Sequence, residues 1–150
     1  MDTTQLKNWI EEFLKDTDYE LVTLRVSPAN DILVEVDRLE GVDVDFCAEL
    51  NRFLVKKLGD DDYSLEVGSV SLTDPFKTKT QYLKNLGHDV EVLIDGKKLR
   101  GLLVSVDEET FSVDVPEKVE VEGKKRKELQ IHTYTWRYDA PKYVKYDLKF

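Results

Sequence analysis

Residues 63–77, with the sequence YSLEVGSVSLTDPFK, divide the chain into two halves with different patterns. Apolar and polar residues alternate over 63–67, which predicts a half-buried β-strand. Gly68 and Ser69 are expected to interrupt this strand, and Pro75 disfavours helix in the residue before it. The last strand of one domain is therefore predicted to lead into a short, stiff connection to a second domain.

The first expected domain, residues 1–74, has the pattern of a small α/β domain in the order helix, strand, strand, helix, strand. Apolar residues recur at helical spacing over 6–14 and 44–58, and segments 19–26 and 32–36 alternate as strands. Helices that cover one face of a small sheet are the expected packing. A KH-type RNA-binding module has the same order, but the G-x-x-G loop that grips nucleic-acid backbone in such modules is absent here.

The second expected domain, residues 75–150, consists mostly of strand-like segments. Residues 77–86 have some helical character and end at Gly87, and Asp95-Gly96 is a strong signal for a two-residue hairpin. Short strands at hairpin spacing predict a small, strongly bent antiparallel sheet or barrel. The expected strands cover residues 90–94, 99–106, 110–115, 124–133 and 144–150. The expected fold class is therefore α+β.

The charge of the chain is unevenly distributed. The formal net charge is −9, and residues 1–80 carry 18 acidic and 9 basic side chains, whereas residues 81–150 carry 13 of each. The first half should repel free nucleic acid, so any contact with nucleic acid must be local. An acidic surface of this kind favours a basic protein as its partner.

The only dense basic cluster is Lys124-Lys125-Arg126-Lys127. Two interpretations stay open: a solvated hairpin tip whose lysines protect a sheet edge, and a contact with nucleic-acid phosphates. Further basic residues interleaved with aromatic ones would extend a surface for stacked bases, although core packing explains the aromatic residues equally well. These residues are Arg137, Lys142, Lys145 and Lys149, with Trp136, Tyr143 and Tyr146 between them.

No residue pattern points to catalysis, a cofactor or a metal. Cys47 lies on an apolar helical stripe and is expected to be a buried packing residue. Asp60-Asp61-Asp62 lacks the spaced ligands of a calcium loop, and His88 and His132 are isolated. No known hydrolase, P-loop or zinc motif occurs, so an enzyme with a catalytic carboxylate pair is a minor alternative.

The sequence also predicts a cytoplasmic location. No apolar run approaches the ~20 residues of a membrane span. The N-terminus is amphipathic and acidic, unlike a signal peptide. The single cysteine cannot form an internal disulfide, and nothing points to an oxidising compartment.

The stretch from Asp45 to Lys77 resembles the bacterial ribosome maturation factor family RimP. The hallmark of that family is a cysteine-bearing helix, a turn marked by aspartate, a Leu-Glu-Val strand and a Ser-Pro-Gly-Leu-Asp-Arg-Pro linker. Val70-Ser71 here replaces Pro-Gly, and Thr73-Asp74 replaces Asp-Arg, which removes a basic group from the linker. The matching residues are Asp45, Cys47, Leu65-Glu66-Val67, Ser69, Leu72 and Pro75.

The resemblance implies an N-terminal KH-like domain, residues 1–74, and a C-terminal Sm-like barrel, residues 75–150. It implies an assembly factor without enzymatic activity that binds the immature small ribosomal subunit. Such a factor would aid late folding of the small-subunit rRNA and incorporation of a basic ribosomal protein. The expected interdomain linker comprises Gly68, Ser69, Leu72, Asp74 and Pro75.

Two further hypotheses follow from this resemblance and from the charge counts. The acidic first half would hold the basic ribosomal protein, and the barrel would approach rRNA through Lys124, Lys125, Arg126 and Lys127, with Arg137 and Lys142 as additional candidates. The competing interpretation is a protein-interaction adaptor whose barrel binds a peptide and which has no role with RNA.

Overall fold

The computed structural model describes residues 2–123 and 125–148. The chain divides into two compact units, Met1–Ser71 (unit 1) and Leu72–Phe150 (unit 2). These described residues form three helices and two separate sheets, which confirms the α+β class. The expected boundary between domains, after residue 74, stays a prediction.

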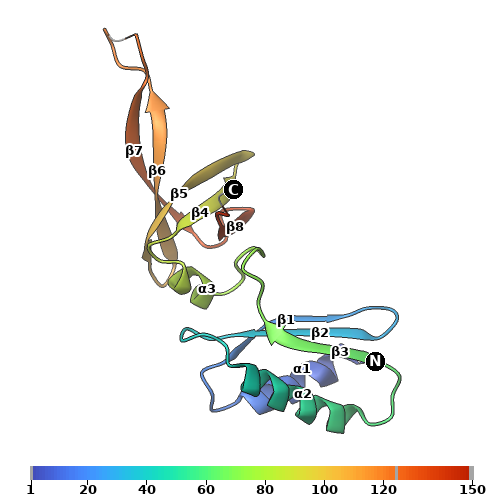
Figure 1. The fold of residues 1–150 in the computed structure, drawn as a ribbon. Helices are drawn as coiled ribbons and strands as arrows, with labels where there is room; N and C mark the ends of the chain where they lie inside the picture. The colour runs from blue at the N-terminus through green and yellow to red at the C-terminus, as the bar shows by residue number, and fades with distance from the viewer. Residues whose placement is uncertain (1, 124, 149–150) are drawn as a thin grey trace. The chain divides into compact units, whose positions relative to one another are not determined.

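Unit 1 has the predicted order of helices and strands. Strands β1 and β2 are antiparallel, and β3 joins the other edge of β2 as a parallel strand. Both helices lie on one face of this sheet (Figure 1). The elements are α1 (Thr3–Leu14), β1 (Glu20–Val26), β2 (Asp31–Asp37), α2 (Val44–Leu58) and β3 (Ser64–Ser69).

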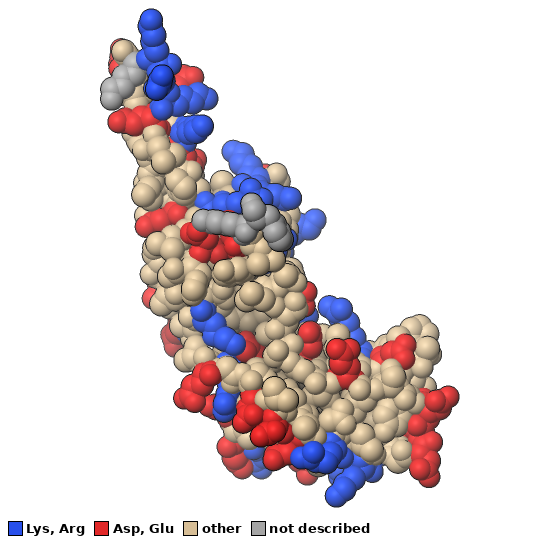
Figure 2. Space-filling model, in the orientation of Figure 1, with Lys and Arg blue, Asp and Glu red and all other residues tan. Residues whose placement is uncertain are grey.

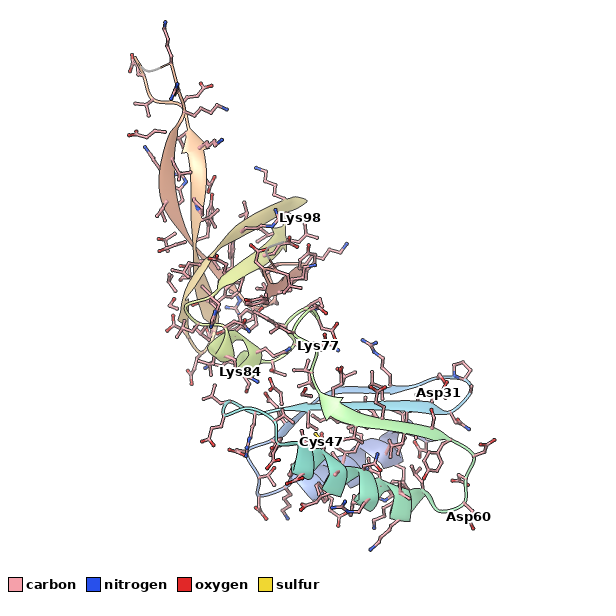
Figure 3. All side chains as sticks on the ribbon, viewed as in Figure 1. Asp31, Cys47, Asp60, Lys77, Lys84 and Lys98 are labelled. Atoms are coloured by element: carbon pink, nitrogen blue, oxygen red, sulfur yellow. The ribbon has the colours of Figure 1, made fainter. Side chains whose placement is uncertain are left out.

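The core of unit 1 forms where the apolar stripes of the two helices meet the sheet. Each helix contributes residues three or four positions apart, because these lie on one face, and β2 contributes alternate residues. Cys47 lies in this core on α2 (Figure 3), as the sequence predicted. The most buried members are Leu6, Ile10, Leu50, Leu54, Val34 and Val36.

The prediction that Gly68 and Ser69 interrupt the last strand of unit 1 was wrong. Both residues belong to β3, where Gly68 is paired with Glu35 and Ser69 with Val36. Glycine disfavours a strand locally, but the parallel ladder with β2 continues through it. The sheet therefore includes two of the expected linker residues, and the connecting role of Leu72, Asp74 and Pro75 stays a prediction.

Unit 2 contains a short helix and one antiparallel sheet of five strands in the order β7-β6-β5-β4-β8. No pairing between β7 and β8 occurs among the described residues, so the expected closure into a barrel is not confirmed. The elements are α3 (Lys79–Lys84), β4 (Asp89–Ile94), β5 (Lys97–Val106), β6 (Thr110–Val119), β7 (Glu128–Arg137) and β8 (Tyr143–Tyr146).

The core of unit 2 lies on one face of this sheet. Tyr82 of α3 packs on Phe111, with ring centroids 5.0 Å apart, and burial raises the pKa of its hydroxyl to about 12. Phe76 donates its N–H to the carbonyl of Val144 at 2.7 Å, which attaches the backbone to β8 directly after Pro75. The other buried apolar residues are Val90, Val92, Leu103, Val113, Val115 and Val144.

Candidate nucleic-acid interface

Strands β6 and β7 form a two-stranded arm at one end of unit 2. The registered pairs between β5 and β6 end at Asp114, whereas β6 continues to pair with β7 as far as Val119 and Glu128. Figure 1 shows the two strands extending away from the other three. We call residues 115–132 the β6–β7 arm. A projecting ribbon of this kind is a suitable carrier for a contact with nucleic acid.

The basic cluster occupies the tip of the β6–β7 arm. Lys125, Arg126 and Lys127 are exposed in the loop between the two strands, and Lys124 lies outside the described residues. The prediction of a strand over 124–133 was wrong at its start, because the pair of Val119 with Glu128 leaves the cations in the loop. Figure 2 shows Lys and Arg side chains gathered at this tip.

Three glutamates accompany Lys125, Arg126 and Lys127 at the tip. Glu120 and Glu122 precede the cluster and Glu128 follows it, and all three are exposed. The negative charges of these neighbouring carboxylates reduce the positive potential that a nucleic-acid phosphate would meet at the tip. The tip is therefore a small cationic site on a surface that carries charges of both signs.

Arg137 and Lys142 lie apart from the tip. Arg137 is the last residue of β7, about 30 Å along the strand from Glu128. Its guanidinium lies 3.7 Å from a carboxylate oxygen of Asp139 and 4.0 Å from one of Glu109. Lys142 is exposed just before β8. The structure thus does not bring the five described contact candidates together on one surface.

The aromatic residues near these cations are engaged in packing. Trp136 and Tyr134 are half-buried and lie nearly parallel, with ring centroids 5.2 Å apart, and Trp136 also contacts Phe111 in the core. Tyr143 donates its hydroxyl to Glu91 at 2.6 Å. These contacts favour the interpretation of core packing over the interpretation of stacked bases.

A buried carboxylate that sequence reasoning missed lies on β4. Glu91 is only 6% exposed and accepts hydrogen bonds from Tyr143 and from Arg100, the latter at 2.7 Å, with the ammonium of Lys145 at 3.6 Å. The Tyr143 hydrogen bond, Arg100 and Lys145 lower the pKa of Glu91. The Asp95-Gly96 hairpin signal places Arg100 opposite Glu91, but no local signal could reveal the burial of Glu91 or its partners from β8.

The residues considered for catalysis or metal binding lie on different elements of the fold. No group of three or more potential metal ligands occurs among the described residues. Burial, followed by the charge of Asp43, raises the pKa of the Cys47 thiol, which disfavours the nucleophilic thiolate. His132 lies beside Glu117 at 3.4 Å, and Asp60 lies in the turn after α2 (Figure 3).

Across the described part of the chain, no helix is both long and apolar enough to cross a membrane.

Comparison with known proteins identifies relatives along almost the whole chain. The family model for the RimP N-terminal domain matches residues 9–72. Ribosome maturation factor RimP of Porphyromonas gingivalis is 34% identical over 138 residues, which is 90% of this chain and 91% of that protein. The protein of the same name from Flavobacterium psychrophilum is 26% identical over 122 residues, 80% of this chain and 79% of that protein. The chain therefore belongs to the RimP family of ribosome maturation factors.

Proposed function

We propose that the chain binds the immature small ribosomal subunit and assists its late assembly in the cytoplasm, without catalysing a reaction. It would promote folding of the small-subunit rRNA and incorporation of a basic small-subunit ribosomal protein, and then leave. Membership of the RimP family is the observation that carries this proposal.

Unit 1 is the proposed site for the basic ribosomal protein. Residues 1–71, which form unit 1, carry 17 acidic and 7 basic side chains. Such a surface accelerates association with a cationic protein and repels free RNA. We propose a KH-like fold for this unit from the order of its elements, with a protein in place of RNA as its ligand, because the G-x-x-G loop is absent.

Unit 2 is the proposed contact with rRNA. Its short helix and five-stranded antiparallel sheet support an Sm-like fold. The β6–β7 arm would carry Lys124 to Lys127 to the phosphates. Arg137 at the far end of β7 and Lys142 just before β8 would make separate contacts. Phosphate contacts of this kind give affinity that falls steeply with salt concentration.

Sedimentation of cell lysates tests the proposal. A strain that lacks the gene should accumulate immature small subunits. A tagged copy of the chain should sediment with these particles and be absent from translating ribosomes. A normal subunit profile in the deletion strain, with the tagged chain remaining at the top of the gradient, would refute the proposal.

The second candidate function, an adaptor that binds peptides through unit 2, is favoured by one observation. Leu129 and Ile131 of β7 are 63% and 67% exposed, and Leu102 of β5 is 41% exposed. Digestion with RNase separates the two functions. The sedimentation of a factor bound to ribosomal particles is lost after digestion, whereas an adaptor complex with protein survives.

A further inference from the structure

A groove of about 420 Å³ lies on the sheet of unit 2, beside the base of the β6–β7 arm. Leu102 of β5, Pro116 of β6 and Ile131 of β7 form its apolar wall. Pro116 and Ile131 are directly opposite each other in the register of the two strands. The groove therefore combines three exposed apolar side chains from three consecutive strands.

The floor of the groove is backbone. Gly101 of β5 lines it, and the carbonyl of Asp114 approaches this glycine so closely that an added Cβ would lie only 2.2 Å from the oxygen. Leu129 lies two residues before Ile131 and so on the same face of β7. The apolar surface thus continues from the groove along the arm, where Leu129 is 63% exposed.

Carboxylates dominate the rim of the groove. Asp89, Asp114 and Asp147 lie around it with Arg100 as the only cation among its described lining residues. The guanidinium of Arg100 is engaged by Glu91 at 2.7 Å and by Asp147 at 3.6 Å. Asp114 accepts a hydrogen bond from the neutral hydroxyl of Thr133, which leaves its charge in place. This rim attracts cations and repels phosphates.

We propose that the groove binds an extended cationic segment of a protein. One aliphatic side chain of the segment enters the groove between Leu102 and Ile131, and the lysines or arginines beside it meet the aspartates of the rim. An apolar anchor inside a charged rim is the usual anatomy of such contacts. The proposal rests on the basic protein partner proposed above and adds a second contact for it on unit 2, away from the cationic tip.

Titration of the ¹⁵N-labelled full chain with synthetic heptapeptides tests the groove, with amide chemical shifts as the readout. The probe is Gly-Lys-Lys-Leu-Lys-Lys-Gly, and the matched control has serine in place of leucine. The leucine peptide should shift the amides of Leu102, Asp114 and Ile131 in a saturable manner. The serine peptide should bind there at least about tenfold more weakly, because it lacks the apolar anchor.

Substitutions in the chain complete the test. Ile131→Lys should weaken binding of the leucine peptide at least about tenfold, since it removes part of the apolar wall and adds a repelling cation. Val55→Lys, which changes an exposed aliphatic residue of α2 in the same way, should leave binding unchanged. Asp114→Asn is a milder variant that should weaken binding about threefold, and it serves as the test if Ile131→Lys fails to fold.

Several results would overturn the proposal. Equal affinity of the two peptides would show that charge alone drives binding. Shifts confined to unit 1, or an unchanged affinity of the Ile131→Lys protein, would exclude the groove. Saturable binding of a short RNA at these amides would identify the wrong class of partner. Sedimentation with immature subunits is a separate measurement, so failure of the groove and failure of the proposed function can be distinguished.

Discussion

Replacement of Gly101 by alanine should destabilise unit 2 selectively. The added Cβ would lie 2.2 Å from the carbonyl oxygen of Asp114, 2.8 Å from its carbon and 3.0 Å from the Cα of Val115. All three atoms are backbone, so no side chain can rotate away. An ordinary carbon–oxygen contact is about 3.3 Å or longer, so β6 must retreat by about 1 Å.

The expected loss combines two opposing effects. Forced separation of packed backbone costs about 1–3 kcal/mol or more, and this retreat also strains the neighbouring pair of Leu102 with Asp114. Alanine stabilises by about 0.4–1 kcal/mol, because it restricts the unfolded chain. The net loss for unit 2 should be about 1–2 kcal/mol, which lowers the urea midpoint by about 0.5–2 M.

Urea unfolding followed through amide signals of both units is the appropriate assay, since it reports each unit separately. Gly68→Ala is the matched control: Gly68 also lies in a strand, has nothing within 4 Å of an added Cβ, and should be neutral or slightly stabilising. If the Gly101→Ala protein unfolds at the same urea concentration as the control, the close approach of β5 and β6 does not exist in solution and this reasoning fails.

Three further predictions concern other parts of the chain. Glu91→Gln should lower the free energy of unfolding by about 1–3 kcal/mol at pH 7. Because the pKa of Glu91 is lowered in the folded protein, this difference between wild type and variant should shrink as the pH falls below about 4. Urea midpoints measured across this pH range test it. An undiminished difference at low pH would contradict this. Tyr19→Phe should lower the free energy of unfolding by about 1 kcal/mol. The substitution removes the hydroxyl that accepts the N–H of Asp43 at 2.9 Å but keeps the ring stacked on Phe46. Thermal unfolding measures the loss, and an unchanged Tm would show that this hydrogen bond is dispensable. Charge reversal at Lys124, Lys125, Arg126 and Lys127 should weaken binding to immature small subunits and flatten the salt dependence of that binding. If the variant pellets with these particles as well as the wild type does, the cluster is not a contact site.

The sequence was sufficient for features that depend on neighbouring residues. The helical stripes predicted α1 and α2, and the alternating segments predicted most of the strands, because a period of apolar residues marks one buried face of an element. The burial of Cys47 followed from its place on such a stripe. Asp95-Gly96 was correctly identified as the turn between β4 and β5, since Asp95 and Gly96 both have the positive φ that such a turn requires.

Predictions failed where a distant segment decides the outcome. Gly68 and Ser69 stay in β3 because β2 offers a continuous ladder, which no local propensity reveals. The start of β7 at Glu128 is set by its register with β6, and this register places the cations in a loop. The same register separates the tip from Arg137, because the tip lies in the loop before β7 and Arg137 is the last residue of β7.

The sequence by itself determined the identity of the helices and most strands, the acidic character of the first half and the resemblance to the RimP family. Only the tertiary structure decided that Glu91 is buried among Arg100, Tyr143 and Lys145, and that Leu102, Pro116 and Ile131 line one groove. The physical reason is that periodicity encodes which face of an element is buried, whereas strand pairing across long intervals of sequence determines which side chains become neighbours.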